Sequence, residues 1–240
     1  MLKKLRRKRT RERLSKKGVK KIFKIAKRQR RNLRVDEALQ VVQSYGIPIV
    51  ESNLVRTAEA AVAFAENIGY PVAMKIVSDA LHKTDIGGVA LNLRSEADVH
   101  KAYRKLVTNA RRHRLRLGGI LVQRMVDGCE AIVGGKKDAQ FGQTIVFGLG
   151  GIFVEVFADV ALRVVPITKK DAQEMIKEIK GFKILAGYRG RAYDLDALMC
   201  VLLNTSKLLE KNDEIKELDI NPLFALRKGA VAVDARIILE

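Results

Sequence analysis

Cysteine is scarce in this chain: Cys129 and Cys200 are the only two among 240 residues. Two cysteines are too few for a disulfide framework, and their scarcity is typical of proteins of the reducing cytoplasm. The sequence also lacks an apolar run near the roughly 20 residues that a membrane span requires, and no signal-peptide core follows Met1. We therefore expect a cytoplasmic protein without a transmembrane segment.

Acidic residues are nearly absent from the first 34 positions, where Glu12 stands against 18 lysines and arginines. This segment carries +17 of the net charge of +19, so residues 35–240 are close to neutral. We expect a basic extension that is helical or disordered, and apolar residues at helical spacing predict an amphipathic helix within residues 16–31. The extension is interpreted either as a solvated tail or as a contact for RNA or DNA phosphates, with an anionic membrane surface or a partner subunit as further alternatives.

Residues 35–240 lack internal repeats and low-complexity linkers, and their pattern predicts two α/β units packed around a cleft. For the first unit, residues 35–121, helices are expected at 36–45, 57–67 and 95–112, and strands at 47–50, 72–77 and 89–93. The second unit, residues 122–240, is richer in strands. Its expected elements are strands at 120–126, 131–136, 144–147 and 154–167, helices at 168–180 and 194–209, and a final hairpin of 216–226 with 230–239.

Two segments carry groups suited to phosphoryl transfer, KIVSDALHKTDIGG (75–88) and ELDINPL (217–223). The first brings Lys75, His82 and a Gly-Gly turn to the place where a strand gives way to a loop, and the second offers oxygen ligands for a hard metal. A lysine in an apolar strand can instead extend its stem to the surface, and a lone histidine is more often structural than catalytic. Both alternatives stay open.

The final hairpin predicts a metal site, because alternate residues of a strand share a face. If residues 228–229 form a two-residue turn, Leu223 pairs with Asp234, and Asp219, Asn221 and Asp234 face the same side, with Asn221 diagonal to Asp234. Carboxylate and amide oxygens at that spacing suit Mg²⁺. The alternative is a polar face exposed to solvent at the sheet edge.

Gly148, Gly150 and Gly151 allow a ligand to approach the backbone closely, although a tight turn between strands also requires glycine. Together with Glu155 and Arg163 on the expected strand that follows, they are interpreted as the phosphate end of the site. The chain contains neither a Walker sequence nor a complete GxGxxG motif, so it supports neither a P-loop nor a dinucleotide site.

Several motifs follow one another in a characteristic order: SYGIP (44–48), GYPVAMKIVS (69–78), HKTDIGGV (82–89), LVQRMV (121–126), VFGLGGIFVE (146–155), ELDINPL (217–223) and AVDARI (232–237). In this order they resemble the ATP-grasp domain of the ADP-forming acyl-CoA synthetases, specifically the separate β subunit of acetyl-CoA synthetase. The resemblance covers residues 35–240 and leaves the basic extension outside.

The resemblance implies an ATP-grasp fold, with two α/β subdomains enclosing a nucleotide cleft, and ATP or ADP and Mg²⁺ as cofactors. It implies that His82 takes phosphate from a phosphohistidine of a CoA-binding α subunit and passes it to ADP, in an α2β2-type complex. The alternative for His82 is a histidine that positions the phosphate and is never itself phosphorylated. Asp219 is implied to assist the metal or to orient the phosphorylated histidine, and Asn221 and Asp234 to bind the metal. The implied nucleotide contacts are Lys75, Gln123, Val126, Glu130, Gly148, Gly150, Gly151, Glu155 and Arg163, with a strand-face carboxylate as the alternative for Glu130.

Two other functions are weighed against this one. A succinyl-CoA-synthetase-like β chain is the nearer alternative, and the HKTD loop at 82–85 argues against it. A nucleic-acid-associated protein that retains an ATP-grasp scaffold is the other, and it depends on the basic extension alone. The motifs do not fix the acyl group, because the acyl and CoA pockets are expected on the partner.

Overall fold

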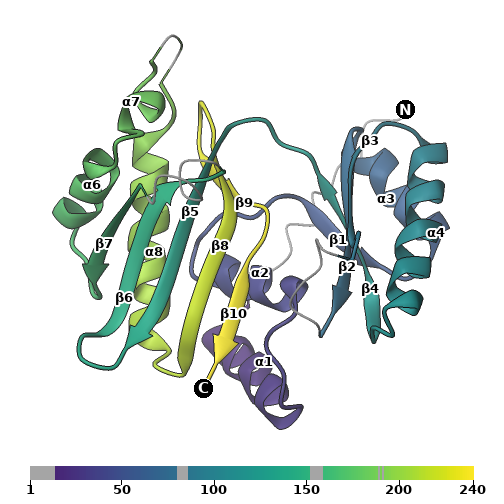
Figure 1. Ribbon diagram of the computed structural model, residues 1–240, viewed down its shortest axis with the longest axis horizontal. Helices are drawn as coiled ribbons and strands as arrows, with labels where there is room; N and C mark the ends of the chain where they lie inside the picture. The colour runs from purple at the N-terminus through teal and green to yellow at the C-terminus, as the bar shows by residue number, and fades with distance from the viewer. Residues whose placement is uncertain (1–13, 80–85, 152–158, 189, 191) are drawn as a thin grey trace, which may run out of the picture.

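The computed structural model describes residues 14–79, 86–151, 159–188, 190 and 192–240. These residues form a four-stranded and a six-stranded sheet, which lie side by side in Figure 1 with helices packed against each. None of the helices within these ranges combines the length and the apolar character that crossing a membrane would need.

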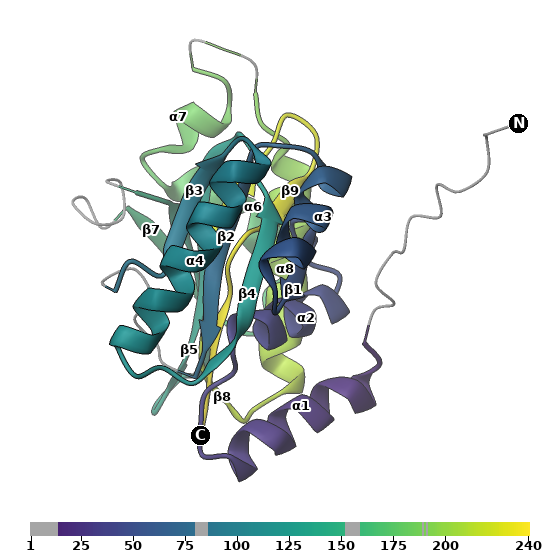
Figure 2. The same cartoon turned by 90° about the vertical axis from the view of Figure 1, so that its right-hand side faces the viewer.

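The small sheet has the strand order β1-β4-β2-β3, and all of its neighbours are antiparallel. Helices α3 and α4 pack against it, as Figure 2 shows. Met74 and Ile76 of the second strand point into the core beneath these helices, whereas Val77 packs in the core of the large sheet. The bounds are β1 Ser52–Val55, α3 Ala58–Ile68, β2 Val72–Ser78, β3 Val89–Leu93, α4 Glu96–Arg112 and β4 Leu117–Arg124.

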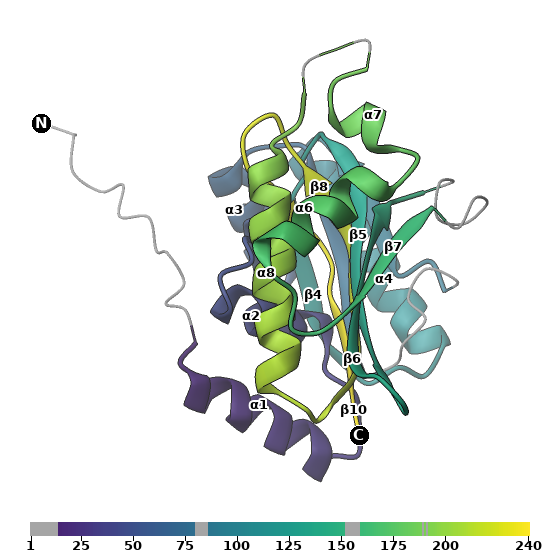
Figure 3. The same cartoon turned by 90° about the vertical axis from the view of Figure 1, so that its left-hand side faces the viewer.

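The large sheet has the order β10-β8-β5-β6-β7, and β9 pairs with the C-terminal end of β8, residues 223–225. The long helix α8 runs along one face of this sheet, with α6 beside it (Figure 3). The bounds are β5 Cys129–Asp138, β6 Gly142–Leu149, β7 Val160–Val164, α6 Lys169–Glu178, α7 Phe182–Leu185, α8 Leu195–Lys211, β8 Ile215–Ala225, β9 Ala230–Ala232 and β10 Arg236–Leu239.

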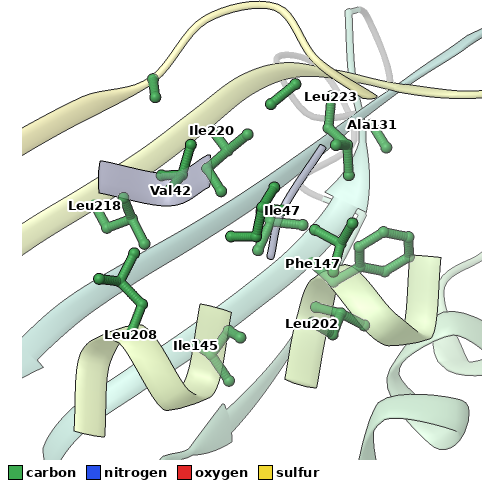
Figure 4. Packing of buried hydrophobic residues seen from close by; sticks show 14 of the residues in the cluster. Val42, Ile47, Ala131, Ile145, Phe147, Leu202, Leu208, Leu218, Ile220 and Leu223 are labelled. Carbon is green, nitrogen blue, oxygen red and sulfur yellow. The ribbon is translucent and has the colours of Figure 1, made fainter. Parts of the chain in front are cut away.

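The first two helices, α1 (Lys16–Arg28) and α2 (Val35–Ser44), pack on the large sheet rather than on the small one. Val42 of α2 and the nearby Ile47 lie among side chains of α8 and the large sheet in Figure 4. Phe23 of α1 is buried in the same core. The larger unit is thus built from both ends of the chain, which differs from the predicted division at residues 34/35 and 121/122. The reason is that the apolar faces of α1 and α2 are buried against the strands that follow residue 125.

Local capping signals place most helix starts where the sequence predicts them. The Thr57 hydroxyl accepts a hydrogen bond from the amide of Ala60 at the start of α3, and Gly69 ends that helix with a φ of 84°. Asp194 caps α8 in the same way. Side-chain acceptors at these positions satisfy amides that the first helical turn leaves without partners.

One strand was predicted at the wrong place. Residues 47–50 form no strand, and only an isolated bridge joins Ile49 to Ala232. The first strand is β1 instead, whose residues Ser52–Leu54 are all half-buried and show no alternation of burial. It is held by its pairing with β4, a contact distant in sequence that a local pattern does not reveal.

Candidate active site

Lys75 lies in the middle of β2 and points away from α3 and α4, toward the large unit. Its side chain is only 8% exposed, and its ammonium group donates a hydrogen bond to Asp234 Oδ2 at 3.0 Å. A second, longer contact of 3.4 Å reaches the carbonyl oxygen of Val233. The side chain therefore does not extend to solvent, and a buried cation joins the two sheets.

Gln123 of β4 lies on the same side of the small sheet and contacts the same segment. Its side chain is fully buried, and its Nε2 donates to the carbonyl oxygen of Val233 at 3.0 Å. Its Oε1 has no hydrogen-bond partner within the described part of the chain. Because an unpaired buried acceptor costs free energy, this atom is a natural contact for a donor that enters the site.

The register of the C-terminal hairpin differs from the prediction by two residues. Leu223 pairs with Ala232 rather than with Asp234, and Arg236 pairs with Asp219. Val233 donates its amide to the carbonyl of Pro222 between these pairs, so the intervening Asn221 lies opposite Asp234 rather than diagonal to it.

The predicted alternation along β8 is also wrong at one point. Leu218, Ile220, Leu223 and Ala225 are all buried in the core, so the alternation slips by one residue after Ile220. The pairing with β5 shifts at the same place, where Ala131 meets Leu223 and Val133 meets Ile220. Leu223 therefore faces the core and does not share a face with Asp219.

Asp219 is a half-buried carboxylate with charged neighbours of both signs. Burial raises its pKa above the ordinary value, as do the negative charges of Asp234 and Glu217, while the positive charge of Arg236 opposes them. The Asp234 carboxylate contacts Lys75 through Oδ2 and accepts the amide of Ala235 through Oδ1 at 2.8 Å. The two aspartates are thus close enough to interact, and each lies beside a different cation.

Asn221 and Asp234 supply the two kinds of oxygen that Mg²⁺ prefers. Asn221 is exposed, and the Asp234 side chain is 31% exposed, so both are open to solvent. The described residues contain no group of three or more His, Cys, Asp or Glu side chains that would form a metal cage. Two protein ligands with remaining positions for water and phosphate fit Mg²⁺, which usually keeps several waters.

The glycine segment after β6 lies against Glu130. The amide of Gly150 donates to the carbonyl oxygen of Glu130 at 2.8 Å. A Cβ atom at Gly150 would lie 3.0 Å from the Cβ of Glu130, and Gly151 has a φ of 62°. Both positions favour glycine, so the chain passes closely over the start of β5, where the Glu130 side chain is exposed. Val126, in the connection between β4 and β5, is half-buried.

Gly148 shares a face of the large sheet with Glu130, because it pairs with Ile132, two residues along β5. Asp219 is on this face as well, opposite Gly134. Gly134 is four residues from Glu130, which corresponds to about 13 Å along a strand. The two carboxylates are therefore spaced to contact different parts of one extended ligand.

Arg163 lies on the opposite face of this sheet. It pairs with the buried Ile145, and its guanidinium group contacts Glu178 of α6 at 2.6 Å. Glu130 and Gly148 lie on the other face of the sheet, so the structure does not bring Arg163 together with them. His82 and Glu155 lie outside the described residues.

Two contacts within the candidate site involve groups that were not among the predicted site residues. The carbonyl oxygen of Val233 accepts hydrogen bonds from both Lys75 and Gln123, and Arg236 contacts Glu217 at 3.3 Å beside Asp219. Both lie in the AVDARI segment, which had drawn attention only for Asp234. Arg236 could have been found from the sequence, because it is a basic residue two positions after the candidate metal ligand Asp234. The carbonyl of Val233 could not, because a backbone acceptor does not depend on the type of residue.

The sequence matches a family described as an ATP-grasp domain over residues 24–239. The match starts within α1, upstream of Val35, where the resemblance was expected to begin. It includes every predicted site residue.

Among characterised proteins, the chain is similar to the β subunit of acetate–CoA ligase [ADP-forming] I from Pyrococcus furiosus. The two are 47% identical over 223 residues, which cover 91% of this chain and 96% of that protein. It is also 40% identical over 226 residues to 4-hydroxybutyrate–CoA ligase [ADP-forming] from Nitrosopumilus maritimus. That match covers 92% of this chain but only 32% of the longer relative.

Among solved structures, the chain resembles acetyl-coenzyme A synthetase 1 of Candidatus Korarchaeum cryptofilum in complex with coenzyme A and Ca-AMPCP. The TM-score is 0.88 at 44% identity, covering 92% of this chain and 99% of that chain. Another complex of that synthetase holds Mg-AMPPCP, with a phosphohistidine segment pointing towards the nucleotide binding site. The predicted ATP-grasp fold is thereby confirmed.

Proposed function

Because the chain belongs to the ATP-grasp family and is a homologue of the β subunit of ADP-forming acetyl-CoA synthetases, we propose that it binds ADP or ATP with Mg²⁺ between its two sheets. There it transfers a phosphoryl group between the nucleotide and His82. The overall reaction is acyl-CoA + ADP + phosphate ⇌ acid + ATP + CoA. In this chain's step, the P–N bond of phosphorylated His82 breaks and a P–O bond to the terminal phosphate of ADP forms.

The observation that carries this proposal is the contact of 3.0 Å between Lys75 and Asp234. A buried lysine gives phosphates a fixed positive charge in a site of low polarity, where electrostatic stabilisation is strongest. Its counter-ion Asp234 is a candidate metal ligand. The positive charge of Lys75 complements the negative charge of a nucleotide phosphate, and the negative charge of Asp234 complements the positive charge of the metal.

We assign Asn221 and Asp234 to Mg²⁺, which when bound would neutralise charge that develops on the phosphates. Asp219 is assigned to the same end of the site, where it orients the phosphorylated histidine or assists the metal. Gln123, Val126 and Glu130 are assigned to the nucleoside, with the Glu130 carboxylate accepting bonds from the ribose hydroxyls. The phosphates are assigned to Lys75, to the backbone at Gly148, Gly150 and Gly151, and to Glu155.

Arg163 is no longer assigned to the phosphates, because its ion pair with Glu178 lies on the face covered by α6. The partner in the proposed complex is a CoA-binding α subunit, in an α2β2-type assembly. Relatives are named for acetate and for 4-hydroxybutyrate, so family membership does not choose the acyl group. The proposed location is the cytoplasm, for which the evidence is the scarcity of cysteine.

Calorimetric titration of the purified chain with Mg-ADP tests the nucleotide site. We expect binding, and we expect Lys75→Met to weaken it at least about tenfold, which corresponds to the loss of one charge-assisted hydrogen bond. Lys105→Met, an exposed change of the same charge on α4, is the matched control. Equal affinity of wild type and Lys75→Met would contradict the assignment of Lys75.

Turnover tests the phosphoryl relay. The chain alone should form no acyl-CoA, whereas a complex reconstituted with a CoA-binding α subunit should. His82→Ala should abolish ATP formation by the complex while ADP affinity stays near that of wild type, because the side chain is assigned to chemistry and not to binding. Near-normal turnover of His82→Ala would refute the relay, and full turnover of the isolated chain would refute the need for a partner.

A further inference from the structure

A pocket of about 400 Å³ lies at the far end of the small sheet, near the start of β4. The connection between α1 and α2 passes this end of the sheet in Figures 1 and 2. Three arginines from different segments line the pocket, together with an aromatic ring and two glycines of β4. These residues are Arg34, Arg56, Arg116, Tyr103, Gly118 and Gly119.

This pocket is separate from the site around Lys75. Neither Lys75 nor Gln123 nor Asp234 lines this pocket. Asp79, which also lines it, is four residues beyond Lys75 along β2 and its continuation, about 13 Å away by strand geometry. A ligand in the pocket would therefore occupy a place that the nucleotide site does not use.

The lining carries an excess of positive charge. Among the described lining residues, three arginines face one carboxylate, that of Asp79, which lies 3.6 Å from the guanidinium of Arg31 outside the lining. Arg56 and Arg116 have no ion-pair partner among the described residues. Within the described part of the chain, two guanidinium groups beside this pocket thus have no carboxylate partner.

Arg34 differs because it is held in place. Its guanidinium is 3.3 Å from Glu37 and 3.6 Å from Asp36, yet its buried Nε atom has no hydrogen-bond partner in the described part of the chain. A Cβ atom at Gly118 would lie 3.2 Å from Nη1 of Arg34, so this guanidinium rests directly on the strand. The glycine makes room for the arginine.

Gly119 contributes in a second way. Its φ is 148° and a Cβ there would lie 2.8 Å from the carbonyl oxygen of Val55, so side chains are excluded from this position. The space beside these two glycines is taken by neighbours: Arg34 lies over Gly118, and Leu54 and Val55 lie against Gly119. The donor that the glycines bring to the pocket wall is therefore the Arg34 guanidinium, and guanidinium groups are donors that proteins use for phosphate oxygens.

We propose that this pocket is a second anion site, which binds a small molecule that carries phosphate groups. Arg56 and Arg116 supply positive charge, Arg34 a fixed donor, and Tyr103 and Leu117 an apolar wall for the organic part of the ligand. The volume lies in the range of small-molecule sites and exceeds what a bare phosphate fills. The proposal does not depend on nucleotide binding at Lys75.

Glycine-selective ¹⁵N labelling of the full chain gives a direct test, because only 18 glycine signals arise. Inorganic pyrophosphate is the probe, titrated without Mg²⁺ or nucleotide. The signals of Gly118 and Gly119 should shift and saturate with a dissociation constant below about 1 mM. The double variant Arg56→Gln/Arg116→Gln should weaken this binding at least about tenfold, by the loss of charge-assisted hydrogen bonds.

Arg111→Gln/Arg112→Gln is the matched control, since it removes the same charge from exposed positions at the end of α4. It should leave the shifts of Gly118 and Gly119 unchanged. An equal loss of pyrophosphate affinity in both double variants would show that the binding depends only on the net charge of the chain, and it would overturn the proposal. So would shifts confined to Gly148, Gly150 and Gly151, or the absence of any shift at Gly118 and Gly119.

Discussion

The carboxylate of Asp219 is more costly to ionise in the folded chain than in the unfolded one. Its pKa is raised mainly by burial and secondarily by Asp234, so the folded state holds the proton more tightly than the unfolded state. The ionised group therefore lowers the free energy of unfolding above its ordinary pKa of about 3.9, and this penalty vanishes as the pH falls below that value.

We predict that Asp219→Asn raises the melting temperature at pH 7 and that this gain shrinks toward pH 3. The reason is that the amide removes the cost of a buried charge, which the wild type carries only when Asp219 is ionised. Thermal unfolding monitored by circular dichroism across this range measures it. Asp127→Asn, an exposed change of the same charge, is the control. A gain that grows as the pH falls would contradict the sign.

Asp234 offers a second prediction at this scale. Asp234→Asn keeps the shape of the side chain but removes the charge that faces Lys75 and is assigned to Mg²⁺. We expect the Mg²⁺ concentration for half-maximal ADP binding to rise by about tenfold or more, since one ligand charge is lost. A titration of Mg²⁺ at fixed ADP measures this, with Asp127→Asn again as control. An unchanged titration would count against a metal at this hairpin.

At the scale of elements, the sequence was sufficient where an element is defined by its own residues. Thr57 and Gly69 mark both ends of α3, and the apolar run around Lys75 marks β2. It was insufficient where a contact decides the outcome. In β8, the alternation slips after Ile220, next to Pro222, which has no amide to donate to a ladder. The proline is visible in the sequence and indicates an irregular strand, but the sequence does not show where the pairing with the neighbouring strand shifts.

The loop after β6 gives a prediction for an element. In Gly150→Ala, the new Cβ would meet Glu130 at 3.0 Å, so the loop must move away from β5. We expect a loss of about 1–3 kcal/mol in the free energy of unfolding, as is usual for overpacking, measured by urea denaturation. Gly190→Ala, where the nearest atom lies 3.6 Å away on the flexible side chain of Arg227, should be nearly neutral. Equal losses would show that the contact with Glu130 is not the cause.

For the whole molecule, the basic N-terminal segment divides into two parts. The helix α1 is anchored by Val19, Phe23 and Ala26, which are all buried in the core of the large unit. Its other face is lined with exposed lysines, and its solvent side shows one ion pair in the described structure, between Lys27 and Glu214. Composition revealed the charge, but the burial of three apolar residues against a sheet formed much later in the chain could not be read from it.

We predict that Phe23→Ala lowers the free energy of unfolding by about 3–5 kcal/mol, because it leaves a cavity in a closed core. Ile25→Ala, two residues further along and 40% exposed, should cost less than about 1 kcal/mol. Urea denaturation of both variants measures the difference. Equal and small losses would mean that α1 contributes little to folding, and residues 1–34 would then be a detachable tail.

The exposed face of α1 carries the last prediction, which concerns contact with RNA or another polyanion. Lys17, Lys20 and Lys24 are exposed and have no ion-pair partner among the described residues, so their charges are free to neutralise phosphates. Each such contact releases counterions and makes affinity fall with salt, by about 0.7–0.9 in the logarithmic slope per phosphate. Replacing all three by Gln should therefore make the slope for RNA binding less negative by about 2–3, as measured by fluorescence anisotropy at several salt concentrations.

The triple variant Lys101→Gln/Lys105→Gln/Lys169→Gln removes the same charge from exposed positions on α4 and α6 and should leave that slope unchanged. Deletion of residues 1–13 separates the two parts of the basic segment, because it removes eight lysines and arginines while leaving α1 in place. If this deletion alone abolished RNA binding and the α1 variant kept the wild-type slope, the helix would serve only to anchor the chain. If both changes reduce the slope, the rigid helix face and the segment before it act as one surface for polyanions.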